Sequence, residues 1–455
     1  DKVVGTVGRG SVAGEAVGTA AGQQVIVGPT DHANAEAIRA ALPWTAPRLL
    51  GLRGGIGLGD RLGLATPGHI RAVRGSGLAC ALAQQSIREM TRTRRTPQEV
   101  LDCATWGVLQ EGFREGFGAD ADHLQKPEDI DVTLAAGFTM FTVDPGAHVD
   151  EGADALGNDA LARRYEALDF ASLETTAREL RQRFVGKKFP LCGGGCVEFD
   201  ERAFLQAVVK YGRAVAYTVQ MFRHLASKAH GEFELEVSVD ETASPTSGAE
   251  HYFIAAELRR LGVRWVSLAP RLVGRFEKGV DYIGDLDLLR RTFSEHVAVM
   301  RTLGPYKLSV HSGSDKFSIY RVVAELADGM MHVKTAGTSY LCALRAIAQI
   351  DPVLFREVLD FARSRYGADR ATYHVSANVA KVPPARAVAD GDLPALLDDF
   401  HAREVLHVTF GSVLTAEGRM RLGSRIMQRL REHEEVYYAM LAAHLGRHVR
   451  LLAGG

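Results

Sequence analysis

The segment FELEVSVD at residues 233–240 alternates apolar and polar side chains without a break. Successive side chains of a β-strand point to opposite faces of its sheet. One face of this strand is therefore aliphatic, and the other carries Glu236, Ser238 and Asp240. Such a strand predicts a sheet that packs against helices on one side and borders a polar space on the other.

The same organisation recurs along the chain, where short strand-like segments are followed by polar loops and then by helical patterns. We expect eight strands, at residues 55–60, 78–84, 118–122, 139–144, 233–240, 263–269, 306–311 and 331–335. Helical patterns lie between most of them, including residues 97–109, 247–261, 286–303 and 317–326. This alternation favours a closed α/β barrel of the TIM type, (β/α)₈, over the alternative of an open doubly wound sheet.

Three further regions surround the expected barrel, which spans residues 51–345. Residues 1–50 form an N-terminal extension packed on the barrel, with a candidate strand at 24–28. An insertion at about 145–230 follows the fourth strand, begins as a polar loop and becomes helical at 204–225. The tail, residues 346–455, is mostly helical, with two strand-like runs, TYHVSANV (372–379) and VLHVTFGSV (405–413).

The composition of the 455 residues is that of an ordinary globular protein, with 46% hydrophobic and 24% charged residues. A net charge of −1 without a basic stripe argues against nucleic acid as a partner. No apolar run of about 18 residues predicts a membrane span, and no signal peptide is visible, so we expect a cytoplasmic protein. The oligomeric state has no signature in the sequence.

The five cysteines do not suggest a disulfide framework, because their number is odd and the chain is long. Cys192 and Cys196 flank three glycines. A structural zinc site would need a second ligand pair at matching spacing, which the sequence lacks. We interpret both as bystander thiols in a flexible loop.

Polar side chains occupy the inward face of five expected strands. Burying charged groups costs several kcal/mol unless they are paired or bound to a metal. We therefore predict a solvated pocket at the C-terminal ends of the strands, where the active sites of such barrels lie. The alternative, a solvent-exposed sheet face, would have to apply to five strands at once.

Carboxylates and imidazoles on one wall are suitable ligands for a divalent metal ion. Mixed oxygen and nitrogen ligands suit Zn²⁺, Mn²⁺, Co²⁺ or Ni²⁺. We expect the ligands to come from His123, Glu236, Asp240, His311 and His332. His123 follows the end of its strand, so the alternation does not fix its direction.

Arginines at the same rim could hold a carboxylate or phosphate of a substrate, because the guanidinium fork matches these groups. The candidates for substrate contacts are Arg61, Gln85, Arg88, Arg271 and Lys316. The glycine-rich segments complete no dinucleotide fingerprint, and neither a P-loop nor a G-x-S-x-G elbow is present. Whether His374 and His407 of the tail reach this rim stays open.

Several long blocks of the sequence resemble the tagaturonate/fructuronate epimerase family. They are GIGLGDRLGLATPGHIRA, LAQQSIREM, GADADHLQKPEDIDVTLAAGFTMFTVDPGAHVD, VSVDETASPTSGAEHYF, LSVHSGSDKFSIY and HVKTAGTSYLCALR. The resemblance runs from about residue 54 to 344 and extends to about 415 through TYHVSANVAKVP and VLHVTFGSVLT. It implies interconversion of D-tagaturonate and D-fructuronate with a divalent metal in hexuronate catabolism, and some members act on fructose and tagatose. It also implies that Ser86, Thr142 and His311 belong to the substrate pocket.

The implied reaction inverts a carbon β to the ketone, which deprotonation beside the carbonyl cannot do. Retro-aldol cleavage, rotation of the aldehyde and re-addition would achieve it. Asp122 or Asp144 would move the hydroxyl proton, with Lys334 or Arg271 near the developing charge. Two alternatives stay open: a metal-dependent aldolase or isomerase of a sugar acid, and a barrel that binds sugar acids without catalysis.

Overall fold

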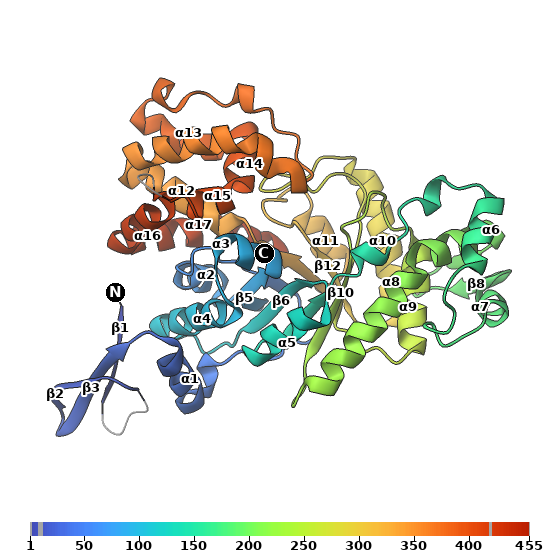
Figure 1. Cartoon of the computed structure of the whole chain (residues 1–455), viewed down its shortest axis with the longest axis horizontal. Helices are drawn as coiled ribbons and strands as arrows, with labels where there is room; N and C mark the ends of the chain where they lie inside the picture. Colours follow the sequence, from blue (N-terminus) through green and yellow to red (C-terminus); the bar gives the residue numbers. More distant parts are fainter. Residues whose placement is uncertain (1, 8–11, 418–420, 455) are drawn as a thin grey trace.

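Eight parallel strands close into a barrel in the computed structural model, which describes residues 2–7, 12–417 and 421–454 (Figure 1). The strands follow one another around the barrel in chain order. They are β4 (Gly55–Gly57), β5 (Ala79–Ser86), β6 (Gly118–Leu124), β7 (Met140–Val143), β10 (Glu234–Val239), β11 (Ser267–Pro270), β12 (Lys307–Val310) and β13 (Met331–Lys334). The predicted (β/α)₈ barrel is confirmed, although β4 ends earlier and β11 begins later than expected.

Helices between the strands form the outer ring of the barrel. They are α2 (Thr66–Val73), α3 (Ile87–Thr93), α4 (Pro97–Glu111), α5 (Pro127–Ala135), α8 (Glu201–Lys228), α9 (Gly248–Arg260), α10 (Leu286–Leu303), α11 (Tyr320–Leu326) and α12 (Thr338–Ile350). Local sequence explains where they begin. The α9 helix starts with a capping box, in which the Ser247 side chain accepts from the Glu250 backbone N–H and the Glu250 side chain accepts in return.

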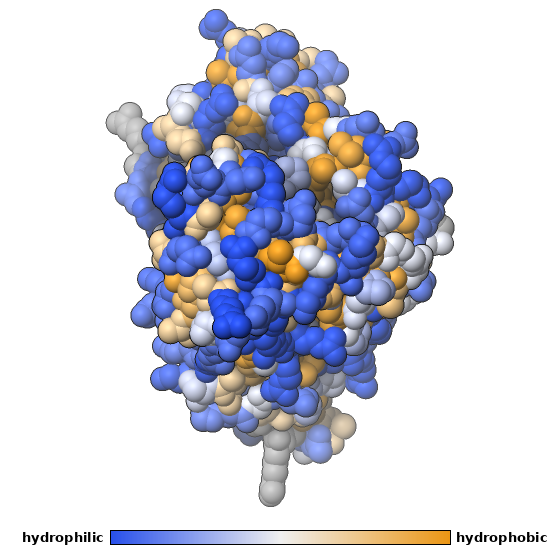
Figure 2. All heavy atoms as spheres, turned by 90° about the vertical axis from the view of Figure 1, so that its right-hand side faces the viewer, coloured by the Kyte–Doolittle hydropathy of each residue, from blue (hydrophilic) through white to orange (hydrophobic). Residues whose placement is uncertain are grey.

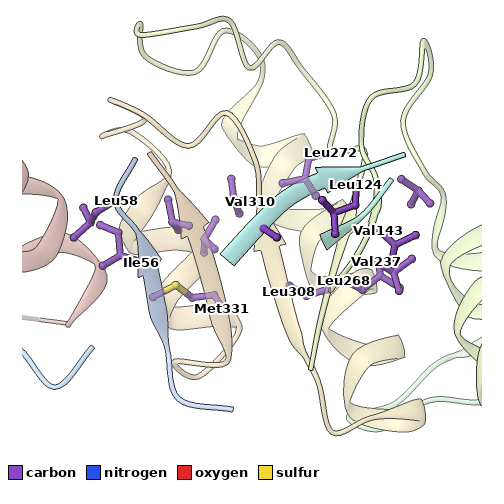
Figure 3. Close-up of a cluster of buried hydrophobic side chains, with 14 of the residues drawn as sticks. Ile56, Leu58, Leu124, Val143, Val237, Leu268, Leu272, Leu308, Val310 and Met331 are labelled. Atoms are coloured by element: carbon purple, nitrogen blue, oxygen red, sulfur yellow. The ribbon is translucent and has the colours of Figure 1, made fainter. Parts of the chain in front are cut away.

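The aliphatic faces of the strands form the layer between sheet and helices. Figure 3 shows side chains of this buried cluster on strands around the barrel, including Ile56, Val143, Val237, Leu268 and Met331. Full burial of each such side chain contributes about 1.5–3 kcal/mol. Because this layer fixes the outward face, the alternate residues of each strand must point into the barrel.

The N-terminal extension is a three-stranded antiparallel sheet followed by a helix, and it projects from the body in Figure 1. Its elements are β1 (Val3–Val7), β2 (Glu15–Ala20), β3 (Gln23–Pro29) and α1 (His32–Ala41). The expected strand at 24–28 lies within β3. Val4, Val12 and Ile38 form a small core against Trp106 and Leu109 of α4.

The region after β7 contains α6 (Asn158–Glu166), α7 (Ala177–Phe184) and a hairpin of β8 (Lys187–Pro190) and β9 (Cys196–Phe199). The helix expected at 204–225 is α8, which packs between α5 and α9 as part of the ring. The added material therefore lies before α8. Figure 2 faces the side that holds this region in Figure 1 and shows a mostly hydrophilic surface with small apolar areas.

The tail is helical and covers one side of the barrel, as the orange and red ribbon of Figure 1 shows. It consists of α13 (Pro352–Asp369), α14 (Phe400–Val408), α15 (Phe410–Leu414), α16 (Leu422–Glu432) and α17 (Glu434–Leu452), with four 3₁₀ segments between α13 and α14. The helix α17 packs against α2 and α12.

The two strand-like runs expected in this tail are not strands. Residues 405–413 lie in α14 and α15, and residues 372–379 form a segment without sheet pairing. Burial of Val405 and Leu406 against other helices overrides the β-propensity of this run. No helix among the described residues is long and apolar enough to cross a membrane.

Candidate functional site

Lys334, on β13, joins inward side chains from three other strands at the centre of the barrel. Its Nζ lies 2.8 Å from Asp120 Oδ2, 2.7 Å from Asp122 Oδ1 and 2.7 Å from Glu236 Oε1. It also donates to Thr142 Oγ1 at 2.7 Å. The polar faces of β6, β7, β10 and β13 thus meet in one buried network.

The charges of this network determine which carboxyl group holds a proton. Burial opposes ionisation of Asp122 and Glu236, but Lys334 and the nearby histidines outweigh it and keep both pKa values below their usual range. Burial, followed by the neighbouring carboxylates, raises the pKa of Asp120 to about 6 despite Lys334. Asp122 is therefore ionised near neutral pH, and Asp120 is the carboxyl group that protonates most readily.

Two glycines of β4 give the inward side chains the room that they occupy. A Cβ on Gly57 would lie 3.2 Å from Gln84 Cγ, and one on Gly55 would lie 2.7 Å from His332 Nδ1. Gln84 Nε2 donates to Asp122 Oδ2 at 2.9 Å and so orients this carboxylate. His332 is fully buried, and burial lowers its pKa to about 3, so its imidazole is neutral.

Three of the five expected metal ligands come together at the C-terminal ends of the strands. His123, Asp240 and His311 each offer one ligand atom, and these atoms lie within 4.8 Å of one another. A divalent ion with two imidazole nitrogens and a carboxylate oxygen would keep open positions for a substrate. Glu236 instead contacts His311 Nε2 at 2.6 Å, and His332 does not join the group.

His123 reaches this group because the backbone leaves the regular strand. Its φ is +51°, in the left-handed region, and the β6–β7 register shifts between Ala121 and Leu124. Its ring then lies edge-on to that of His311, with 5.0 Å between the centroids. Burial opposes protonation of both rings, but nearby carboxylates raise the pKa of His123 to about 9 and that of His311 to about 10. A bound cation would replace these protons.

Asp144 has a different environment from Asp122. Its Oδ1 accepts from the Gly146 backbone N–H at 2.9 Å, and its Oδ2 accepts from Gln125 Nε2 at 2.9 Å. His123 Nδ1 lies 3.5 Å from the same Oδ2. Asp144 therefore orients His123, whereas Asp122 faces the cavity and is the better placed of the two expected bases.

A cavity at the barrel mouth has two chambers, and the metal-ligand group lies where they meet. The inner chamber, about 50 Å³, is lined by residues that include Arg61, Ser86, Asp122 and Lys334. The outer chamber, about 280 Å³, is lined by residues that include Asp240, Arg271 and His374. Both chambers share Arg88, His123, Lys278, Ser312 and Tyr373. A larger cavity of about 720 Å³ near the β8–β9 hairpin contains none of the inward barrel residues.

The three expected arginines all line this cavity, but they differ in their partners and in the chamber that they line. Arg61 is buried, bonds Glu89 through Nε at 2.8 Å and stacks 3.7 Å above the ring of Phe410. Arg88 pairs with Glu241 at 2.9 Å. Arg271 lines the outer chamber only.

Three of the expected substrate contacts, Gln85, Thr142 and Lys316, do not line either chamber. Gln85 accepts from Arg95 Nη1 at 3.3 Å instead of facing the pocket. The ammonium of Lys316 donates to the backbone carbonyls of Glu277, Val280 and Ser314. This lysine connects two loops. Thr142 instead donates to Asp120 and accepts from Lys334.

Lys278 and Tyr373 were not predicted from the sequence, and the position of His407 was left open; all three line the inner chamber. His407 comes from α14, and a Cβ on Gly337 would lie 1.7 Å from its Nε2, so only glycine fits there. The tail therefore contributes to the site, and His374 lines its outer chamber. Loop and tail residues follow no strand alternation; only the sequence blocks of the family resemblance pointed to residues 372–379 and 405–413.

Comparisons with known proteins point to one enzyme family. A family model described as tagaturonate epimerase matches residues 6–452. A tagaturonate/fructuronate epimerase from Thermotoga maritima is 44% identical over 426 residues, covering 93% of this chain and 86% of the relative. Crystal structures of the fructuronate-tagaturonate epimerase UxaE from Cohnella laeviribosi, native and with glycerol, match with a TM-score of 0.91 and 37% identity. They cover 97% of this chain and 89% of theirs.

Proposed function

The chain belongs to the tagaturonate epimerase family, and we propose that it interconverts D-tagaturonate and D-fructuronate at the mouth of its barrel. The observation that carries this proposal is the position of His123, Asp240 and His311 at the cavity that Asp122 and Lys334 also line. Sequence identity of 44% to an epimerase of this name over nearly the whole chain supports the same activity.

A divalent cation, Zn²⁺, Mn²⁺, Co²⁺ or Ni²⁺, would be held by His123, Asp240 and His311. The donor set fits, because the three side chains offer two nitrogens and an oxygen within 4.8 Å of one another. When bound, such an ion would polarise the ketone of the substrate and stabilise negative charge on its oxygen. Glu236 at 2.6 Å from His311 Nε2 and Asp144 at 3.5 Å from His123 Nδ1 would orient the two imidazoles.

The inversion requires a proton to leave and return at one hydroxyl group. Asp122 takes the proton from the hydroxyl on the carbon β to the ketone, and the bond from that carbon to the α-carbon breaks. The bonding electrons move toward the ketone, and the β-carbon becomes an aldehyde. After the aldehyde rotates, the same bond forms on its other face and Asp122 returns the proton. Gln84 and Lys334 fix the position of Asp122 throughout.

The neutral pair D-fructose and D-tagatose is a second candidate substrate. These sugars differ at a carbon in the same relation to the ketone, so the same bond would break. They lack the carboxylate of the hexuronates. We expect the chain to act on them more slowly than on the uronates.

Incubation of the purified protein with D-fructuronate, followed by chromatography of the products, tests the proposed function. D-Tagaturonate should form, dialysis against a chelator should stop its formation, and one of the four cations should restore it. Full activity after chelation would contradict the metal proposal. Three-carbon fragments without an epimer would identify an aldolase. Binding without turnover would identify a sugar-acid binding protein.

A further inference from the structure

We propose that Arg61 and Lys278 together form the subsite for the substrate carboxylate, and that this subsite sets a preference for hexuronates over neutral ketohexoses. This inference rests on the proposed function and specifies which end of the substrate the inner chamber holds. The two residues follow β4 and β11, and both line the inner chamber.

Arg61 offers a hydrogen-bond donor that has no partner among the described residues. Its Nε lies 2.8 Å and its Nη2 lies 2.6 Å from Glu89 Oε1, and the guanidinium stacks on Phe410. The side chain is only 3% exposed, and its Nη1 is buried without a hydrogen bond. Buried N–H groups almost always have a partner in folded proteins. A ligand oxygen in the chamber would supply one.

Lys278 has no carboxylate in direct contact within the part of the chain that the structure describes. Burial lowers the pKa of its ammonium, and Glu241, Glu89 and Asp240 only partly offset this from a greater distance. The Lys278 Nζ donates to Ser312 Oγ at 2.6 Å, and within the described ranges no carboxylate oxygen lies within 4.0 Å of it. The other cations of the chamber are compensated: Arg88 pairs with Glu241, and Lys334 pairs with three carboxylates. A substrate carboxylate is the group that would balance Lys278.

His407 lines the same chamber without adding a charge. It is 1% exposed, and burial, followed by Arg61 and Lys278, holds its pKa well below the usual range. A neutral imidazole adds no positive or negative charge at this end of the chamber. The carboxylate would therefore meet one charge from Lys278 and one directed N–H from Arg61, which a neutral hydroxymethyl group could use only in part.

The test compares D-fructuronate with its uncharged methyl ester in the full-length, metal-loaded protein. The Lys278→Met variant should raise KM for the acid at least tenfold, with a much smaller change in kcat, and should leave the KM for the ester nearly unchanged. Arg61→Lys keeps the charge and loses the guanidinium fork. It should also raise the acid-to-ester ratio, that is, the KM for the acid divided by the KM for the ester. Arg275→Met removes an exposed cation from the outer chamber only and should leave the ratio as it is.

An unchanged acid-to-ester ratio in both Lys278→Met and Arg61→Lys would overturn the proposal. So would an equal loss of activity on acid and ester, because that would indicate a structural or catalytic role. An equally large shift in Arg275→Met would attribute the preference to the general field at the barrel mouth. Calorimetric binding of acid and ester separates this inference from the proposed function. If the wild-type protein binds the acid more tightly but does not epimerise it, the subsite stands and the proposed function fails.

Discussion

Two walls of the cavity differ in how their charges are compensated. The wall formed by the strands contains Lys334 within 2.8 Å of three carboxylate groups, so its cation is fully paired. The wall formed by loops and tail contains Lys278, which has a hydroxyl partner, and Arg61, which keeps a free N–H. From this difference we infer a division of labour. The strand wall supports proton transfer, and the loop wall, where Arg61 is paired with Glu89 but Lys278 contacts no carboxylate of the described chain, binds an anion.

Removal of Lys334 should have the largest effect, because it would leave three buried carboxyl groups without their cation. We expect Lys334→Met to lose epimerase activity and to lower the free energy of unfolding by about 3–5 kcal/mol, measured by denaturant titration. Adding Asp120→Asn should recover part of this loss, since it removes one of the unpaired charges. A stable, active Lys334→Met variant would show that the strand wall is not held by this network.

Asp122→Asn should lower kcat strongly and leave the fold intact. The amide keeps the shape of the side chain and removes the proton acceptor, so we expect a decrease of about 10²–10⁴-fold. The matched variant Asp144→Asn should have a smaller effect on kcat and mainly weaken metal binding through His123. Steady-state kinetics and metal titration of both variants check this order. A reversed order would assign proton transfer to Asp144.

Lys316→Met tests the loop wall without touching either chamber. The lysine ties the backbone of residues 277–280 to the loop after β12, so its loss should let Lys278 move. We expect KM for D-fructuronate to rise several-fold with kcat little changed, and stability to fall by about 1–3 kcal/mol. If kcat falls and KM stays constant, Lys316 acts on the strand wall instead.

The smallest expected effect is a change in the pH dependence of stability. The pKa of His407 is well below 6.5 in the folded protein, because of burial and nearby cations, and about 6.5 when unfolded. Below pH 6.5 the unfolded chain therefore binds a proton that the folded chain does not, and the folded state loses stability as the pH falls. His407→Gln should flatten this slope by up to about 1.4 kcal/mol per pH unit between pH 6.5 and 5. Identical slopes in both proteins would show that His407 is accessible to protons.

The strand wall was largely predictable from the sequence, and the loop wall was not. Alternation with a period of two placed Glu236 and Lys334 on the inner face, because the aliphatic layer leaves no other orientation for them. No such period governs loops. Lys278 and Lys316 are both lysines in loops after barrel strands, but only the first lines the cavity.

Two other features of the site could not be predicted because they depend on the backbone path or on packing between distant segments. His123 joins the metal-ligand group through a positive φ that follows from no side-chain pattern. The run at 405–413 has the composition of a strand, yet its burial among helices makes it helical and brings His407 to the cavity. Both cases depend on tertiary packing, which a single sequence does not display.

The central claim is that a divalent cation binds among His123, Asp240 and His311. Anomalous diffraction from crystals grown with Zn²⁺ or Mn²⁺ tests it most directly. We expect a single strong peak at about 2.0–2.2 Å from one atom of each of the three side chains. A peak instead among Asp315, His444 and His448, the grouping in which Asp315 already pairs with Arg403, would contradict it.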